Sequence, residues 1–176
     1  MKTDKPTTKI IAGKYKGKVL ELPSLDVTRS SKAMLKESLF NVLQFDIIDK
    51  IFIESFAGSG SIGLEAISRG AKRSYFIELD KGSYQILVKN CKLVDIEKYQ
   101  TIQGNTFVQT PLMLEFLKNS KEQIVLYIDP PFDYREGMED IYKKSFHMIE
   151  NIEVDNNIMI VIEHLSNLEI PEVLCK

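Results

Sequence analysis

A glycine-rich turn between an apolar run and a helical pattern constrains this chain more than any other stretch. Residues 51–53 are apolar and β-prone, Glu54 follows them, and the turn Gly58-Ser59-Gly60 comes shortly after. From Ile62 onward the apolar residues are spaced as in a helix. Strand, tight turn and helix in this order open a nucleotide-binding α/β unit. The turn also fits G-x-G-x-x-G up to Gly63, so a dinucleotide-dependent dehydrogenase is one alternative.

Strand-like and helix-like stretches alternate along the chain beyond this turn. Such alternation predicts an α/β fold with a doubly wound, mostly parallel sheet, right-handed crossovers and helices on both faces. We expect strands at residues 51–54, 74–78, 99–103, 124–129 and 157–163, and helices near residues 61–69, 81–93, 108–119 and 137–150.

Ligands of doubly wound sheets bind beyond the carboxyl ends of the strands. The residues at or just past these ends are Glu54, Glu78, Asn105, Asp129 and Glu163, and four of the five are acidic. Strand formation does not require acidic residues at these places. We therefore expect the functional site at this edge of the sheet.

The first 46 residues are predicted to form a small extension of the main domain, residues 47–176. Residues 9–22 predict two short strands joined by a glycine-containing turn. A helix follows, with a Ser or Thr between residues 28 and 31 as its N-cap, and its apolar residues are expected to face the core. These residues are Met34, Leu35, Leu39, Val42 and Leu43. Extension and main domain are expected to form one compact unit.

The formal net charge of −2 hides an uneven distribution along the sequence. Residues 1–36 contain nine Lys or Arg and three acids, a net charge of +6, which leaves −8 for residues 37–176. A basic arm on an acidic body suggests that the N-terminal part docks a polyanion such as RNA. A solvated, lysine-rich leader is the alternative. The cations expected to contact phosphate are Lys14, Lys16, Lys18, Arg29, Lys32 and Lys36.

Cysteine content and hydropathy favour a cytoplasmic protein. Cys91 and Cys175 are isolated and lack the spacing of a metal site, as is usual in a reducing compartment. The sequence shows no signal peptide and no apolar stretch long enough to span a bilayer. His147 and His164 have no nucleophile or metal partner at a useful spacing, so we interpret both as structural. We expect a cytoplasmic monomer without a bound metal or a membrane partner.

Glu78 is the candidate for binding the ribose of a nucleoside ligand. It closes the second predicted strand, twenty residues after Gly58, where a carboxylate can accept hydrogen bonds from both ribose hydroxyls. Asp80 is a neighbouring competitor, but the alternating apolar run places Glu78 at the tip of the strand. The alternative is a solvent-exposed acidic residue in a loop.

Asp129-Pro130-Pro131-Phe132 follows the apolar strand of residues 124–128 and brings a carboxylate to the edge that carries the glycine turn. The two prolines stiffen the chain and leave carbonyl oxygens as acceptors. Phe132 adds an aromatic face. Carboxylate, carbonyl and aromatic ring together suit an exocyclic amino group on a stacked base. A rigid loop without chemistry is the alternative. A dehydrogenase needs no such motif, and little of the chain remains for its substrate domain.

This motif resembles the signature of class I S-adenosylmethionine-dependent methyltransferases that act on amino groups of nucleic-acid bases. The chain as a whole resembles the bacterial 16S ribosomal RNA guanine-N2 methyltransferase family. Four blocks carry the resemblance over most of the chain: residues 10–17, residues 28–29 with 36–43, residues 56–60 with 63–66 and 68–71, and residues 129–132.

The resemblance implies S-adenosylmethionine as cofactor and assigns residues to it. Glu54 and the turn would hold the methionine portion, Glu78 with Leu79 the ribose, and Gly104, Asn105 and Thr106 would border the adenine. The residues of the turn are Phe56, Ala57, Gly58, Ser59 and Gly60. Asp129, Pro130, Pro131 and Phe132 would receive the target base, in an extruded or single-stranded form.

Several positions depart from the family pattern. Glu54 and Asn105 stand where the family usually has Asp, Ser30 replaces a usual proline, and Ala33 and Met34 replace a usual acid–arginine pair. The family continues through a closing hairpin after Glu163-His164, which predicts a short or missing last strand here.

The resulting hypothesis is methyl transfer from S-adenosylmethionine to N2 of a guanine in 16S ribosomal RNA, free or in the assembling small subunit. Asp-Pro-Pro-Phe does not specify the base, so an amino-methyltransferase acting on DNA or transfer RNA is an alternative. A catalytically idle RNA-binding relative is a second one. The presence of both Glu78 and an intact motif at residues 129–132 argues against it, since RNA binding requires neither.

Overall fold

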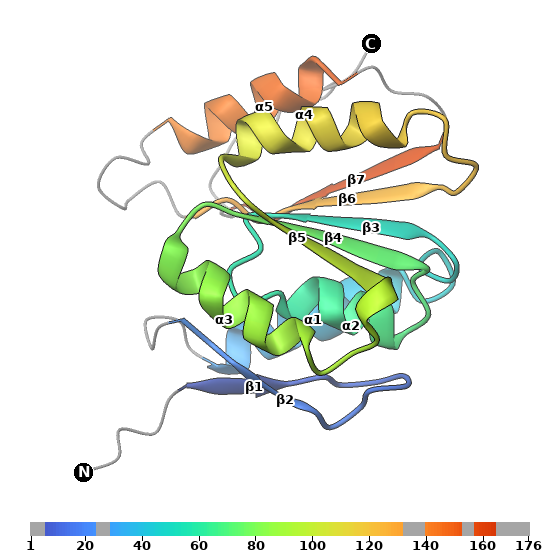
Figure 1. The fold of residues 1–176 in the computed structure, drawn as a ribbon, viewed down its shortest axis with the longest axis vertical. Helices are drawn as coiled ribbons and strands as arrows, with labels where there is room; N and C mark the ends of the chain where they lie inside the picture. Colours follow the sequence, from blue (N-terminus) through green and yellow to red (C-terminus); the bar gives the residue numbers. More distant parts are fainter. Residues whose placement is uncertain (1–5, 24–28, 132–139, 153–156, 165–176) are drawn as a thin grey trace.

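A parallel five-stranded sheet forms the centre of the protein (Figure 1). The computed structural model describes residues 6–23, 29–131, 140–152 and 157–164. The strand order is β5-β4-β3-β6-β7, and each neighbouring pair is parallel. This order confirms the predicted doubly wound sheet. The strands are β3 (Ile51–Ser55), β4 (Arg73–Glu78), β5 (Tyr99–Gln103), β6 (Ile124–Ile128) and β7 (Ile158–Ile162).

Helices cover both faces of the sheet (Figure 1). They are α1 (Arg29–Val42), α2 (Ser61–Ser68), α3 (Lys81–Cys91), α4 (Thr106–Leu117) and α5 (Ile141–Glu150), with a 3₁₀ turn at Ile96–Lys98. Side chains alternate along β3, so Ile51 and Ile53 pack with α4 and α5 while Phe52 packs with α1 and α2. Within the described part of the chain, the helices are too short or too polar to cross a membrane.

The position of β3 creates the point at which ligands of such sheets bind. From β3 the chain first builds β4 and β5 on one side, then crosses to β6 and β7 on the other. The carboxyl ends of β3 and β6 therefore lie at a topological switch point, where the connecting helices leave in opposite directions. Ser55 at the end of β3 is paired with Ile128 at the end of β6.

The N-terminal extension forms a second layer outside the helices (Figure 1). Strands β1 (Thr7–Lys9) and β2 (Val19–Glu21) pair in antiparallel orientation. Two short strands were predicted within residues 9–22, and the first of them lies earlier, at residues 7–9. Between them, the backbone N–H groups of Ile11 and Ala12 donate to the buried carboxylate of Glu65 on α2 at 2.7 and 2.9 Å.

A glycine allows the extension to approach α2 this closely. A Cβ on Gly13 would lie 1.8 Å from the carbonyl oxygen of Ser68, and the φ angle of Gly13 is +82°. The Ser68 carbonyl accepts from Lys14 N at 2.8 Å, and its hydroxyl accepts from Tyr15 N at 2.9 Å. The extension is thus held by backbone hydrogen bonds and a glycine contact to the helix that follows the glycine turn.

The buried face of α1 differs from the prediction. Leu43 is buried as expected, but Met34 and Val42 are 71% and 76% exposed and Leu35 is also exposed. The buried stripe instead contains Lys36 and Phe40, together with Leu43. The prediction considered only apolar residues, whereas the stem of a lysine packs in a core when its ammonium group finds oxygen partners.

Candidate active site

The turn after β3 has a backbone conformation that favours glycine. Phe56, Gly58 and Gly60 have φ angles of 62°, 54° and 75°. A Cβ on Gly60 would lie 2.5 Å from Leu87, whereas one on Gly58 would meet no atom within 4 Å. The positive φ of Gly60 therefore favours glycine, and a side chain there would also displace Leu87. Gly58 instead leaves open space beside the backbone, into which a ligand can approach.

Glu54 places a buried carboxylate next to this turn. Its side chain is 3% exposed, and Oε2 accepts a hydrogen bond from Gly63 N of α2 at 2.8 Å. Burial raises the pKa of Glu54 to about 8, although the N–H groups of Gly63 and Ile62 act against this shift. Nearby Asp129 raises the pKa further and Lys36 lowers it. A cationic group placed here would favour the ionised carboxylate.

Glu78 lies at the tip of β4, as predicted, and organises the turn. Its Oε2 accepts from Gly58 N at 2.6 Å and its Oε1 accepts from Asp80 N at 2.7 Å. Each carboxylate oxygen has a further lone pair for a ligand hydroxyl. Asp80 itself is the N-cap of α3 and accepts from Ser83 N at 2.7 Å. Its carboxylate therefore stabilises a helix end, which leaves Glu78 as the better candidate for ribose binding.

Asn105 and Thr106 lie where β5 passes into α4. The Asn105 side chain is the N-cap of α4 and accepts from Phe107 N at 2.9 Å. Thr106 is buried in the first turn of the helix, and Leu79 beyond β4 is 61% exposed. Their roles toward an adenine and a ribose stay predictions.

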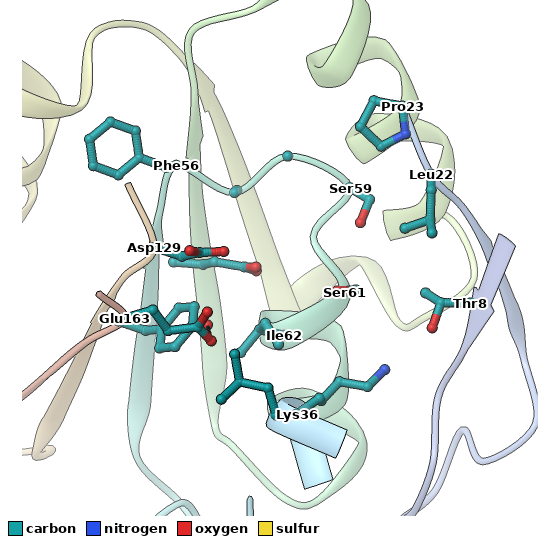
Figure 2. A pocket seen from close by; sticks show the side chains of 15 residues that line it. Thr8, Leu22, Pro23, Lys36, Phe56, Ser59, Ser61, Ile62, Asp129 and Glu163 are labelled. Carbon is teal, nitrogen blue, oxygen red and sulfur yellow. Dashed lines mark hydrogen bonds between the residues drawn. The ribbon is translucent and has the colours of Figure 1, made fainter. Parts of the chain in front are cut away.

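One cavity of about 140 Å³ lies at the switch point and brings several predicted residues together (Figure 2). The main domain contributes β3 with the turn after it, the start of α2, and the ends of β6 and β7, and the extension contributes β1, residues 22–23 and α1. It is lined by Thr8, Leu22, Pro23, Leu35, Lys36, Glu54, Phe56, Ala57, Gly58, Ser59, Ser61, Ile62, Tyr127, Asp129 and Glu163. Gly60, Glu78, Leu79, Asn105 and Thr106 lie outside this lining, although Glu78 is bonded to Gly58 within it.

Asp129 enters this cavity from the end of β6 (Figure 2). Glu54 lines the same cavity from the paired strand β3, close enough for the charge of Asp129 to raise its pKa. Pro130 is buried and Pro131 partly buried behind it. Phe132, the fourth residue of the predicted motif, lies outside the described residues.

Tyr127 and Glu163 complete this side of the cavity. Glu163 was expected at the carboxyl edge of the sheet without an assigned function, and Tyr127 was not singled out. The Tyr127 hydroxyl donates a hydrogen bond to the Glu163 carboxylate. A signal for both was present: Tyr127 is two residues before Asp129 and thus on the same face of β6, and Glu163 follows the last strand.

The cations predicted to bind RNA lie in three different environments. Lys14 and Lys18 are exposed, but Lys14 Nζ is 2.6 Å from the Asp95 carboxylate and Lys18 Nζ donates to the Leu93 carbonyl at 2.6 Å. Lys16 is exposed on the same turn. Arg29 and Lys32 belong to the first turns of α1, and their side chains lie outside the described part.

Lys36 differs from the prediction because its side chain is only 3% exposed. Its Nζ donates to the Lys9 carbonyl at 2.8 Å and lies 3.6 Å from Glu65 Oε2. Burial lowers the pKa of Lys36, and the Glu65 carboxylate opposes this effect. The side chain lines the cavity from α1 (Figure 2). This placement suits a residue that supports the cavity wall, and leaves no surface for a contact with RNA phosphate.

The donor and acceptor groups of the cavity fit S-adenosylmethionine. Open space beside Gly58 admits a ligand close to the backbone, and the buried Glu54 carboxylate is suited to a positively charged group such as the ammonium of a methionine moiety. Glu78 lies just outside the cavity lining, where it accepts hydrogen bonds from the N–H groups of Gly58 and Asp80. Its carboxylate offers further acceptors to a ligand that extends past Gly58. Metal-type clusters of three or more His, Cys, Asp or Glu are absent from the described residues.

The sequence matches a known protein family and is similar to named relatives. The sequence model of the family described as "Conserved hypothetical protein 95" matches residues 8–176. Ribosomal RNA small subunit methyltransferase D of Haemophilus influenzae is 37% identical over 133 residues, which cover 74% of this chain and 66% of that protein. The protein of the same name from Buchnera aphidicola (Acyrthosiphon pisum) is 33% identical over 144 residues, covering 81% of this chain and 69% of the relative. The chain therefore spans about two thirds of the length of these relatives.

A solved structure shows the same architecture. A Haemophilus influenzae protein has a TM-score of 0.63 and 31% sequence identity to this chain, covering 95% of this chain and 88% of its own. The fold is the Rossmann-like fold of class I methyltransferases.

Proposed function

Since the chain belongs to the family of conserved hypothetical protein 95 and is similar to small-subunit ribosomal RNA methyltransferases, we propose that it methylates small-subunit ribosomal RNA. The proposed cofactor is S-adenosylmethionine and the proposed target is the exocyclic N2 amine of a guanine. The substrate is 16S RNA, free or within the assembling subunit.

One observation carries this proposal: Glu54, the turn at residues 56–59 and Asp129 line a single cavity at the switch point of the sheet. Glu54 and the turn come from the β3 side, where a nucleoside cofactor binds in such folds. Asp129 comes from the adjacent strand. A group that receives an amine thus lies directly beside the cofactor side, as methyl transfer requires.

The protein residues mainly align the cofactor with the target amine and accept the proton that the amine loses. Glu54 would hold the ammonium group of the cofactor, and Glu78 its ribose hydroxyls. Asp129 would accept a hydrogen bond from the target amine, orient its lone pair and take up the proton that the nitrogen loses. When bound, S-adenosylmethionine supplies a methyl group that is already activated by the adjacent sulfonium. No further activation of the methyl group by the protein is needed.

The proposal is tested by incubating the purified protein with labelled S-adenosylmethionine and either naked 16S RNA or immature small subunits. Digestion to nucleosides and mass spectrometry then identify the product. We expect N2-methylguanosine, and Asp129→Asn as the matched variant should form it more slowly. Label on adenosine, cytidine, transfer RNA or DNA would instead support the alternative amino-methyltransferases. RNA binding without any label would indicate an idle relative.

A further inference from the structure

A second carboxylate, that of Glu163, lies beside Asp129 on the side of the edge strand β7. Glu163 follows β7, and its backbone N–H donates to the carbonyl of Ile128 at 2.9 Å, one residue before Asp129. Neighbouring strands are about 4.8 Å apart. Figure 2 shows the Asp129 and Glu163 side chains pointing from adjacent strands into the same cavity.

Tyr127 fixes the orientation of this second carboxylate. Its hydroxyl donates to Glu163, and its ring is buried among the residues beneath the cavity. Burial raises the pKa of Tyr127, and the charges of Asp129 and Glu163 add to this, so the hydroxyl stays protonated and keeps donating. A carboxylate has about four acceptor sites. The bond from Tyr127 orients the carboxylate, and a carboxylate can accept several hydrogen bonds at once.

The strand order assigns Glu163 to the side of the methyl acceptor. The glycine turn and Glu78 belong to β3 and β4, so the cofactor side lies toward β4. Asp129 on β6 comes next, and Glu163 on β7 is one strand further from the cofactor side. A base whose amine faces Asp129 can therefore present one of the two ring atoms beside that amine to Glu163.

We propose that Glu163, oriented by Tyr127, selects guanine by accepting a hydrogen bond from its ring N1–H while Asp129 receives the N2 amine. This inference rests on the proposed function and specifies which base the cavity admits. In guanine the amine and N1–H are adjacent donors, which match two adjacent carboxylates. In adenine and cytosine the ring nitrogen beside the amine is an acceptor, and its lone pair would face the Glu163 carboxylate. A site built to accept a hydrogen bond rejects such bases strongly.

The test compares two RNA substrates that differ at N1 alone among their edge donors. A short RNA with the target guanine is compared with the same RNA carrying 2-aminopurine, which keeps the 2-amino group but has an unprotonated N1. Rates are measured for the wild type, Glu163→Gln and Tyr127→Phe. Glu150→Gln, an exposed position on α5, is the matched control. Cofactor affinity of each variant is measured as a check on folding.

Glu163→Gln should lower the guanine to 2-aminopurine rate ratio by at least about tenfold, because its amide can donate to the unprotonated N1. Tyr127→Phe should shift the ratio in the same direction by less, and Glu150→Gln should not shift it. If Glu163→Gln slows both substrates equally, or neither, the residue only supports the structure and the inference fails. That result is distinct from failure of the proposed function, in which the wild type forms no N2-methylguanosine.

Discussion

At the carboxyl edge of the sheet, the carboxylates on the β3–β4 half and on the β6–β7 half are oriented by different kinds of hydrogen-bond donor. On the β3–β4 half, Glu54 and Glu78 accept hydrogen bonds from backbone N–H groups of the glycine turn and of the helices that follow. On the β6–β7 half, Glu163 is oriented by the side-chain hydroxyl of Tyr127. Backbone donors persist whatever the sequence, whereas a side-chain donor is lost by one substitution. The half proposed for the cofactor is therefore fixed by the fold, and the half proposed for the base can be changed residue by residue.

The largest effect is expected on the β6 side, from Asp129→Ala. Removal of the group that receives the amine should lower turnover by roughly 10²-fold or more, with cofactor affinity largely unchanged. Asp129→Asn keeps one acceptor and should retain part of the activity if alignment dominates. Single-turnover methyl transfer and calorimetric cofactor titration measure the two quantities. Methylation by Asp129→Ala at the wild-type rate would show that another group receives the amine.

On the β4 side a smaller effect is expected, and it should appear in cofactor affinity rather than in turnover. Glu78→Ala removes charge-assisted hydrogen bonds and should weaken S-adenosylmethionine binding by roughly 1.5–3 kcal/mol. Asp80→Ala is the matched control, because it removes the N-cap of α3 and should cost about 1 kcal/mol of stability without loss of a ligand contact. Titration calorimetry and thermal unfolding distinguish the two. Equal cofactor affinity in both variants would remove Glu78 from the site.

Glu54 should link cofactor binding to pH. Because burial raises its pKa to about 8, the protonated form stabilises the unliganded fold, and this contribution is lost as the pH rises through 8. A cofactor ammonium favours the ionised form, so binding should release a proton near pH 7. The gain in melting temperature on adding S-adenosylmethionine should grow from pH 6 to pH 9, and Glu54→Gln should abolish this trend. A gain that is independent of pH in the wild type contradicts the assignment.

The smallest effect is expected from the extension. Lys14 and Lys18 already have the partners Asp95 and the Leu93 carbonyl, so Lys16 should account for most of the electrostatic contact. Lys16→Gln should reduce the slope of log affinity against log salt by about 0.7, the value for one phosphate of single-stranded RNA. Lys121→Gln, an exposed charge elsewhere, is the control. An unchanged slope in Lys16→Gln would leave this turn as a solvated surface.

The parts of the site that could be predicted from the sequence are those in which the backbone conformation restricts the residue. Gly60 occupies a left-handed turn against Leu87. Glu54, one residue before the end of β3, and Glu78, at the end of β4, follow the apolar runs that predict these strands. The sheet type was predicted from the alternation of strand-like and helix-like stretches along the chain. The division of the chain after residue 46, the RNA contacts and the role of Phe132 stay predictions.

Burial of polar side chains could not be predicted in this way. Lys36 is buried because the Lys9 carbonyl and Glu65 happen to meet its ammonium group, and these partners come from two other segments of the chain. Glu163 gains its place beside Asp129 only once β7 pairs with β6. Such placements depend on tertiary contacts, which local patterns do not contain.

The contact of Gly13 with Ser68, and of the neighbouring N–H groups with Glu65, has a consequence for protein engineering. A chimera that exchanges the N-terminal hairpin with that of a relative should fit if glycine is kept at position 13 and the carboxylate at position 65. Any larger residue at position 13 would push the hairpin away from α2. The Glu65 carboxylate would then lose its hydrogen bonds from the N–H groups of Ile11 and Ala12. The hairpin and α2 therefore form one packing unit, and recombination breakpoints should lie outside both segments.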